Sequence, residues 1–160
     1  EENAKVIRAL EFVAVLDDRT SLICAANDGT VWEFDDPQLP VPPLHFNCRS
    51  ALVPVVDWAA LGLPEPEPGE RAARDLSGVS AEDLDRKVSA RRRTGDLGRQ
   101  TTVSSAVKYE QWLRDQPTRV QDKVLGATRA KLFREGRVTL RELIRSDGTL
   151  IPLSELLATA

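Results

Sequence analysis

Two stretches decide the fold of this chain: Asp17-Asp18-Arg19-Thr20-Ser21-Leu22-Ile23-Cys24 and Pro42-Pro43-Leu44-His45-Phe46-Asn47-Cys48-Arg49-Ser50. Between them they hold both cysteines and the only histidine of the 160 residues. Any metal binding or nucleophilic chemistry that uses sulfur or imidazole must therefore lie in these two stretches.

The composition predicts one compact core. Apolar residues make up 41% of the 160 residues, which suits one modest core better than two separate ones. No run is long and apolar enough to span a bilayer, and none has the order of a signal peptide, so we expect no membrane contact. Two cysteines without a secretory signal favour a reducing compartment, where a free or metal-bound pair is expected rather than a disulfide.

The residues around the first stretch predict a small antiparallel β unit. Residues 6–16 are almost entirely apolar and predict a buried strand, and residues 30–34 alternate polar and apolar side chains as a pairing strand does. Residues 51–56 predict a third strand, which Pro54 marks as an edge because proline cannot donate to a ladder.

The same unit is expected to contain one short helical turn. Thr20 or Ser21 can cap a helix over residues 22–26, which Asn27-Asp28-Gly29 would end. The turn would hold Cys24 in place, while the proline-dense residues 38–43 would stiffen the loop that presents the second stretch.

Three parts are expected along the chain. Residues 1–61 form the β-rich unit, and residues 62–79 form an acidic, proline-rich linker that begins at Leu63-Pro-Glu-Pro-Glu-Pro-Gly-Glu. Residues 80–160 form a basic helical part that completes the same domain. The predicted fold class is α+β, with the helical half packed against the β unit.

Capping residues and breakers place the helices of the second half. The expected helices begin at Ser80, at Ser104 or Ser105, at Pro117, at Ala127 and at Thr139, and a last one covers residues 152–157. The first could run toward Arg91-Arg92-Arg93, and glycines at 126 and 136 would end the third and fourth.

Charge is distributed unevenly along the chain. Residues 1–85 carry six Lys and Arg against seventeen Asp and Glu, whereas residues 86–145 carry sixteen against six. A basic half predicts a surface that faces a polyanion, although solvated helix faces can carry the same charge. The candidate DNA contacts are Arg91, Arg92, Arg93, Arg119, Lys123 and Arg129.

The two stretches also predict a metal site. His45 and Cys48 have a spacing that lets both bind one soft divalent ion, and Cys24 can reach it across the β unit. Zinc is the metal that this donor set suggests. A structural zinc site needs a fourth ligand, which would be Asp18, another residue or water. The alternative is a pair of buried free cysteines beside a histidine that bonds to main-chain carbonyls.

The arginines of the two stretches suggest a structural role. Arg19 and Arg49 each follow the central residues of one stretch, and either could form a two-pronged ion pair with Asp17 or Asp18. With Thr20, these residues make up the structural motif that we expect to hold the two stretches together.

An enzymatic role has weaker support in the sequence. A cysteine with His45 could act as nucleophile and base, and an acidic set could bind magnesium for phosphodiester cleavage. The acidic set comprises Asp17, Asp18, Glu33, Asp35 and Asp36. Such residues at strand ends are ordinarily solvated, so we expect no catalysis. A zinc-ribbon-like adaptor would need a fourth ligand that the sequence does not supply.

A family resemblance rests on both stretches. Asp17-Asp18-Arg19-Thr20-Ser21 with Cys24 and Gly29, then Pro42-Pro43-x-His45-x-Asn47-Cys48-Arg49-Ser50, resembles the signature of the phage Mu F-like head morphogenesis family. Further similar residues in the second half are Gln111-Trp112-Leu113, Pro117, Gln121, Leu125-Gly126-Ala127-Thr128-Arg129 and Leu132-Phe133-Arg134-Glu135-Gly136. Residues 62–103 resemble the family least.

The resemblance implies a minor head protein of a tailed bacteriophage, a structural protein near the portal or capsid interior that can contact packaged DNA. It implies the virion as the location, and the host cytoplasm during assembly. Family members usually carry a helical region before the motif, so the chain would correspond to their C-terminal domain. Many relatives have cysteine where this chain has Ser21 and Ser50, which makes a zinc site more credible in them.

Overall fold

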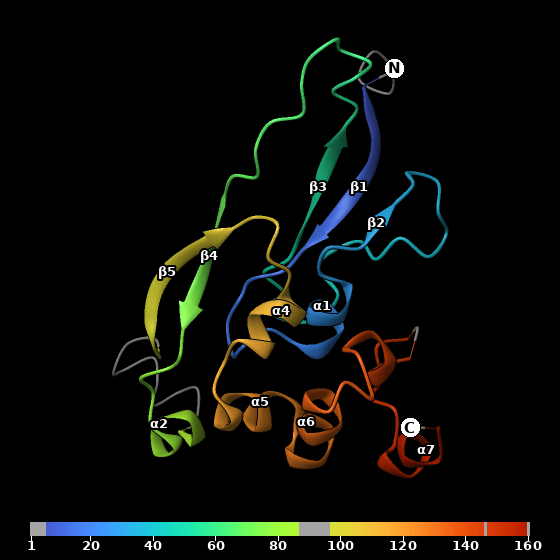
Figure 1. The fold of residues 1–160 in the computed structure, drawn as a ribbon. Helices are drawn as coiled ribbons and strands as arrows, with labels where there is room; N and C mark the ends of the chain where they lie inside the picture. The colour runs from blue at the N-terminus through green and yellow to red at the C-terminus, as the bar shows by residue number, and fades with distance from the viewer. Residues whose placement is uncertain (1–5, 87–96, 146, 160) are drawn as a thin grey trace.

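The computed structural model of the protein describes residues 6–86, 97–145 and 147–159. Its mixed α+β architecture, with small antiparallel sheets and a helical second half, confirms the predicted fold class (Figure 1). The elements follow in the order β1 (Ile7–Val13), α1 (Leu22–Asn27), β2 (Val31–Trp32), β3 (Ala51–Val56), β4 (Glu70–Asp75), α2 (Ala81–Asp85), β5 (Arg99–Ser104), α4 (Tyr109–Arg114), α5 (Thr118–Leu125), α6 (Ala127–Arg134), the 3-10 helix η2 (Arg141–Leu143) and α7 (Leu153–Thr159).

The first sheet has β1 in its centre. Both β2 and β3 pair with β1 antiparallel, so that Leu10 lies opposite Trp32 on one side and opposite Pro54 on the other. Pro54 lies on an edge strand, as predicted, because β3 has no partner other than β1 among the described residues. Figure 1 shows β1 and β3 projecting away from the helices as a ribbon.

The short helix that begins within the first stretch is also confirmed. Ser21 is the N-cap of α1, and its Oγ accepts a hydrogen bond from the main-chain N–H of Cys24 at 3.4 Å. Gly29 has a φ of 80°, which turns the chain back toward β2 at low conformational cost.

The expected linker over residues 62–79 is wrong for its second half. Residues 70–75 form β4, which pairs antiparallel with β5 and contacts Leu16 through a parallel bridge at Ala73. The Pro-Glu repeat ends at Pro68, and the residues after it bury Ala73 and Leu76. The Pro-Glu composition of residues 63–70 predicted a linker, whereas strand β4 begins at Glu70, two residues after the last proline of the repeat.

The helix starts of the second half were predicted with mixed success. Ser80 caps α2, with the N–H of Asp83 donating to Ser80 Oγ at 3.1 Å, but α2 ends at Asp85. Residues Arg91 to Arg93, toward which it was expected to run, lie outside the described residues. Ser104 and Ser105 begin no helix, because Ser104 closes β5 and its Oγ accepts from Ala106 N in a turn. Helix α4 begins four residues later.

The remaining helices follow the sequence pattern closely. Pro117 precedes α5, and Gly126, with a φ of 79°, separates α5 from α6. Thr139 and Glu142 form the expected reciprocal pair around η2: Thr139 N donates to Glu142 Oε2 at 2.7 Å, and Glu142 N donates to Thr139 Oγ1 at 3.4 Å. None of the helices within the described ranges is long and apolar enough to cross a membrane.

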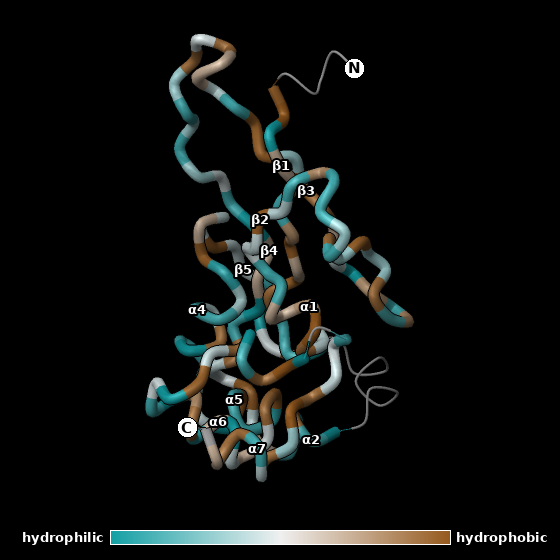
Figure 2. Tube along the Cα trace, turned by 90° about the vertical axis from the view of Figure 1, so that its right-hand side faces the viewer, coloured by the Kyte–Doolittle hydropathy of each residue, from teal (hydrophilic) through white to brown (hydrophobic). Residues whose placement is uncertain are grey.

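One main core unites the two halves of the chain. It includes Leu16 from the first half and Tyr109, Trp112, Leu113 and Phe133 from the helices, all fully or almost fully buried. Figure 2 shows apolar stretches in both the strands and the helical part. A second, smaller cluster contains Phe12, Ala14 and Cys24, with Leu44, Cys48 and Leu52 packed against it. The candidate site lies in this smaller cluster.

Candidate metal centre

The two cysteines and the histidine converge. Cys24 lies on α1 and is buried, while His45 and Cys48 lie in the loop between β2 and β3. Cys24 Sγ is 3.2 Å from His45 Nε2 and 3.8 Å from Cys48 Sγ. Within the described ranges, these three residues are the group whose ligand atoms lie close enough to share one metal ion.

The distances fit one zinc ion. A tetrahedral zinc with Zn–S bonds of about 2.3 Å holds two sulfur ligands roughly 3.8 Å apart. The Cys24 and Cys48 sulfurs have this separation of 3.8 Å, and both cysteines are free rather than disulfide-bonded. The donor set of two sulfurs and one imidazole nitrogen is one that zinc prefers.

The ring of His45 is oriented as a metal ligand would be. His45 Nδ1 lies 2.9 Å from the main-chain oxygen of Phe46, and because a carbonyl can only accept, Nδ1 carries the proton. In the neutral ring, Nε2 then presents its lone pair toward the sulfur of Cys24. Metal-binding histidines commonly donate their other ring N–H to a carbonyl in this manner.

A tight turn sets the spacing of His45 and Cys48. The N–H of Cys48 donates to the carbonyl of His45 at 3.1 Å, and Asn47 between them has a φ of 61°. Asparagine tolerates this left-handed conformation better than most residues. The turn therefore places the imidazole and the thiol on the same side of the loop.

The two thiols differ in their readiness to ionise. Burial raises the pKa of the Cys24 thiol, and the neighbouring Cys48 adds to this rise. Cys48 is less deeply buried than Cys24. Burial raises the pKa of the Cys48 thiol, but main-chain hydrogen bonds involving Ser50 and Leu44 outweigh this effect and lower the pKa to about 7. At neutral pH, Cys48 is thus the thiol that supplies a thiolate first.

Among the described residues, no carboxylate joins the three converging side chains. Asp18, an expected fourth ligand, does not join the converging group. Ser21 is nearer, with its Oγ 2.8 Å from His45 Nε2, and a cavity of about 510 Å³ lined by Ser21, His45, Cys48 and Arg19 opens beside it. A hydroxyl or water is the fourth ligand that this geometry can offer.

Asp17 and Arg49 tie the two stretches together. Arg49 Nη1 donates to Asp17 Oδ2 at 2.6 Å, and Nη2 donates to Oδ1 at 2.8 Å, which is the two-pronged pair that the sequence suggested. The Asp17 carboxylate is almost fully buried, and burial raises its pKa. The Arg49 guanidinium and the N–H of Arg19 outweigh burial, so the pKa of Asp17 is lowered overall.

The other motif residues support this pair. The main-chain N–H of Arg19 donates to Asp17 Oδ1 at 3.0 Å, and the hydroxyl of Thr20 donates to the carbonyl of Val15 at 2.6 Å. The phenol of Tyr109 donates to the main-chain oxygen of Asp17 at 2.8 Å and so links α4 to the motif. The hydroxyls of Thr20 and Tyr109 therefore act as internal cross-links, whereas Arg19 contributes its main-chain N–H and is itself exposed.

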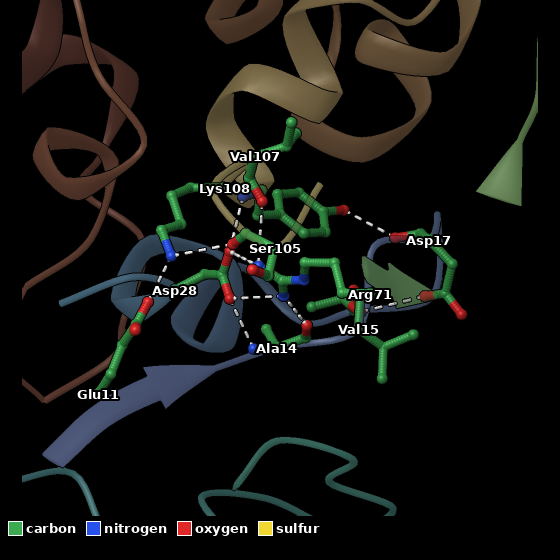
Figure 3. A network of polar contacts seen from close by, with 11 residues as sticks. Glu11, Ala14, Val15, Asp17, Asp28, Arg71, Ser105, Val107 and Lys108 are labelled. Carbon is green, nitrogen blue, oxygen red and sulfur yellow. Dashed lines mark hydrogen bonds and ion pairs between the residues drawn. The ribbon is translucent and has the colours of Figure 1, made fainter. Parts of the chain in front are cut away.

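Sequence reasoning missed a fully buried and heavily bonded carboxylate, that of Asp28. It accepts from Ala14 N at 2.6 Å, from Tyr109 N at 2.7 Å and from Arg71 Nη2 at 2.9 Å (Figure 3). Its side chain is 0% exposed. Because Asp28 belongs to an Asn-Asp-Gly turn, its sequence context predicted an ordinary turn residue.

Arg71 completes this network. Figure 3 shows its guanidinium between Asp28 and the main-chain oxygens of Ala14 and Val107, each of which accepts a hydrogen bond from it. Arg71 lies on β4, in the segment expected to be a linker. The network therefore joins β1, β4 and the start of α4.

The candidate DNA contacts that the structure describes all bond within the protein. Arg119 donates to the carbonyls of Val79 and Ser77, and Lys123 pairs with Asp85 at 3.0 Å near the same cavity beside α2. Arg129 donates to the carbonyl of Ile151 at 3.0 Å, toward the C-terminal end. Arg91, Arg92 and Arg93 lie outside the described residues.

The acidic set expected for magnesium does not converge in the part of the chain that the structure describes. The Asp17 carboxylate forms an ion pair with Arg49, and the Asp36 carboxylate accepts a hydrogen bond from Gln38 N at 2.8 Å. No three carboxylates of the set lie as close together there as the cysteines and the histidine do.

Comparison with known proteins identifies one family similarity. Residues 1–53 match a family model described as Phage Mu protein F like protein. The matched region, about a third of the 160 residues, contains both stretches, α1 and the three converging side chains. It ends at residue 53, so the similarity suggested for the second half stays a prediction. No curated protein and no solved structure matches the chain.

Proposed function

We propose that this chain is a structural protein of a tailed bacteriophage head that acts in head morphogenesis. The observation that carries the proposal is the match of residues 1–53 to the Mu F-like family, within which the motif side chains bond to one another. The side chains of Asp17, Thr20 and Arg49 form hydrogen bonds inside the protein. Such internal cross-links are what a rigid structural domain requires. The role is structural and not enzymatic.

The expected partners are the portal or capsid proteins of the same particle. The protein would act in the host cytoplasm during assembly and remain in the virion near the portal or capsid interior. A helical region preceding the motif, which the family resemblance implies, would make this chain the C-terminal domain of the head protein.

The test is made in the phage or prophage that encodes the chain. Mass spectrometry of purified virions should detect the protein, and deletion of its gene should reduce the yield of filled heads. Restoring the gene with Arg49→Ala should rescue poorly, whereas Arg86→Ala, which changes an exposed arginine directly after α2, should rescue fully. Normal heads without the gene, and no protein in the virion, would refute the proposal.

We include one zinc ion in the proposal, held by Cys24, His45 and Cys48. When bound, it would fix α1 against the loop before β3, because its ligands come from both. The small cluster around Phe12 and Cys24 has few large side chains, so a metal would add stability where apolar burial is limited.

Contact with packaged DNA is a further part of the proposal. It is supported by the basic balance of residues 86–145, and Arg91, Arg92 and Arg93 are its main candidates. Arg119, Lys123 and Arg129 already bond within the protein. Binding to duplex DNA should fall steeply with salt and should be lost when residues 91–93 become alanine. Undetectable binding at low salt would leave only protein partners.

One observation favours a metal-dependent nuclease or other hydrolase as the alternative. Three protein ligands beside an open cavity resemble catalytic zinc sites, which keep one position free, and Arg19 lines the same cavity. Cleavage of DNA by the purified protein with zinc, magnesium or manganese, abolished by His45→Ala, would support this alternative. Absence of cleavage under all three metals would reject it.

A further inference from the structure

The two thiols of the chain lie close enough to form a covalent bond with each other. The Sγ atoms of Cys24 and Cys48 are 3.8 Å apart, and both cysteines are free. A disulfide has an S–S distance of about 2.0 Å, so the sulfurs need to approach each other by less than about 2 Å. Cys48 lies in the loop between β2 and β3, so it can shift without breaking the hydrogen bonds of a helix or strand.

Contacts that require no metal ion hold the two thiols together. The carboxylate of Asp17 accepts two hydrogen bonds from Arg49, the residue that follows Cys48. Cys24 is buried in a cluster with Phe12, and Cys48 packs against that cluster. The sulfurs therefore stay adjacent whether or not an ion binds. Two reacting groups that are held together in this way react as if each were highly concentrated around the other.

The two thiols differ in their exposure to small solutes. Cys48 is partly exposed and lines the cavity of about 510 Å³ that opens beside the centre. Cys24 is only 1% exposed. A small oxidant such as hydrogen peroxide can enter this cavity and reach Cys48, whereas the protein shields Cys24 from it. Oxidation should therefore begin at Cys48, because reaction of a thiol follows its exposure.

We propose that Cys24 and Cys48 are a redox-sensitive pair that hydrogen peroxide converts to a disulfide within one chain. The Cys48 sulfur attacks one peroxide oxygen, the O–O bond breaks, and the products are a Cys48 sulfenic acid and one water molecule. The Cys24 sulfur then attacks the Cys48 sulfur, the S–O bond breaks, and the hydroxyl leaves with the Cys24 proton as a second water molecule. Two thiols lose two electrons to one peroxide, and a dithiol reductant reverses the change.

The disulfide and a bound zinc ion exclude each other. Cys24 and Cys48 are two of the three converging ligands, and zinc binds their thiolate forms. Sulfurs that are joined to each other lose the negative charge that makes them strong ligands, so His45 alone would remain. Loss of zinc on oxidation rests on the zinc site of the proposed function, whereas disulfide formation needs only the two thiols. Either cross-link joins α1 to the loop before β3.

Peptide mapping of the oxidised wild-type protein tests the disulfide directly. Protein that a chelator has freed of metal should lose both thiols in dilute hydrogen peroxide, and a peptide pair joined through Cys24 and Cys48 should appear under non-reducing conditions. Dithiothreitol should restore both thiols. The yield should not change on dilution, because the bond forms within one chain. A product joined between chains, or irreversible oxidation of Cys48 without a disulfide, overturns the proposal.

Single-cysteine variants test the order of the two steps. In Cys24→Ser, Cys48 should form a sulfenic acid that dimedone traps, whereas in Cys48→Ser the buried Cys24 should react at least about tenfold more slowly. In urea the two variants should react at similar rates, since burial no longer protects Cys24. Wild type should give roughly a tenth or less of the dimedone adduct of Cys24→Ser, because Cys24 removes the sulfenic acid. Equal amounts of adduct in these two proteins overturn the proposal.

Zinc release separates the redox pair from the zinc site itself. Protein that is loaded with one zinc ion should release it to a colorimetric indicator at the rate at which the disulfide forms, and dithiothreitol should allow zinc to bind again. A protein that takes up no zinc but forms the disulfide supports the redox pair and refutes the zinc site. Zinc that stays bound after the disulfide has formed overturns the mutual exclusion of disulfide and metal.

Discussion

The carboxylate of Asp28 caps the helix that begins at Tyr109. Asp28 Oδ2 accepts from the main-chain N–H of Tyr109 at 2.7 Å, although 81 positions separate the two residues. Helix α4 has no cap of its own, because the side chain of Lys108 at its N-cap position makes no capping hydrogen bond. A residue of the β unit therefore completes a helix of the second half.

Replacing Asp28 should strongly destabilise the protein. Asp28→Ala removes the cap of α4 and leaves the guanidinium of Arg71 buried without its carboxylate. Removing one partner of a buried ion pair costs about 3–5 kcal/mol of unfolding free energy. Urea unfolding followed by circular dichroism measures the change.

The matched control for this variant is Asp35→Ala, which removes an exposed carboxylate from the loop after β2 and should change stability by less than about 0.5 kcal/mol. The double variant Asp28→Ala/Arg71→Met should recover part of the loss, since it no longer buries an unpaired charge. Equal stability of Asp28→Ala and wild type would show that the network contributes nothing.

Local sequence patterns predicted those helix starts and ends whose capping or breaking residues lie within a few positions of the helix. Ser21 caps α1 as expected, and Gly126 separates α5 from α6. The start of α4 could not be predicted in this way, because its cap comes from Asp28 in another part of the chain. Strand β4 was missed because its sequence adjoins the Pro-Glu repeat, and its pairing with β5 is a tertiary interaction.

The candidate site was more predictable than the network that supports it. Cys24, His45 and Cys48 are the only residues of their types, so their convergence required only that the two stretches meet. The pairing of Arg49 with Asp17 followed from the same requirement. Arg71 gave no such signal, since an arginine in an acidic segment is ordinarily solvated.

The Asp17 and Arg49 pair should make stability depend on acid pH. The pKa of Asp17 in the folded protein lies below its ordinary value of 3.8, so the unfolded chain binds the proton more readily. The pair's contribution is therefore fully present above about pH 4 and is lost as the pH falls through the lower, folded-state pKa. Asp17→Asn should flatten this part of the curve of unfolding free energy against pH.

The pH comparison needs a carboxylate whose loss leaves the curve unchanged. Asp36→Asn serves this purpose, because the Asp36 carboxylate accepts a hydrogen bond from Gln38 N within its own turn. The same acid-dependent loss of stability in wild type and in Asp17→Asn would show that other groups cause it.

Cys48 should react faster than Cys24 with alkylating reagents. Its pKa is lowered to about 7, whereas burial raises that of Cys24, which is 1% exposed. The metal-free protein should be modified first at Cys48, with a rate that rises through neutral pH as the thiolate forms. Peptide mapping by mass spectrometry identifies the site. Faster modification of Cys24 at every pH would contradict the assignment.

Zinc binding should depend on all three converging residues and improve when Ser21 becomes cysteine. The purified protein should bind one zinc ion, and His45→Ala or Cys48→Ala should abolish stoichiometric binding because two ligands remain. Ser21 Oγ lies 2.8 Å from His45 Nε2, so Ser21→Cys places a fourth strong ligand beside the other three and should raise the affinity at least tenfold. Phe46→Ala is the control and should bind zinc as wild type does. His45 bonds to the main-chain oxygen of Phe46, which alanine keeps, and Phe46 is 92% exposed. Cobalt substitution gives the readout: Ser21→Cys should show the stronger thiolate charge-transfer bands of a site with three sulfurs. Identical spectra and affinities for wild type and Ser21→Cys would place the fourth ligand away from Ser21.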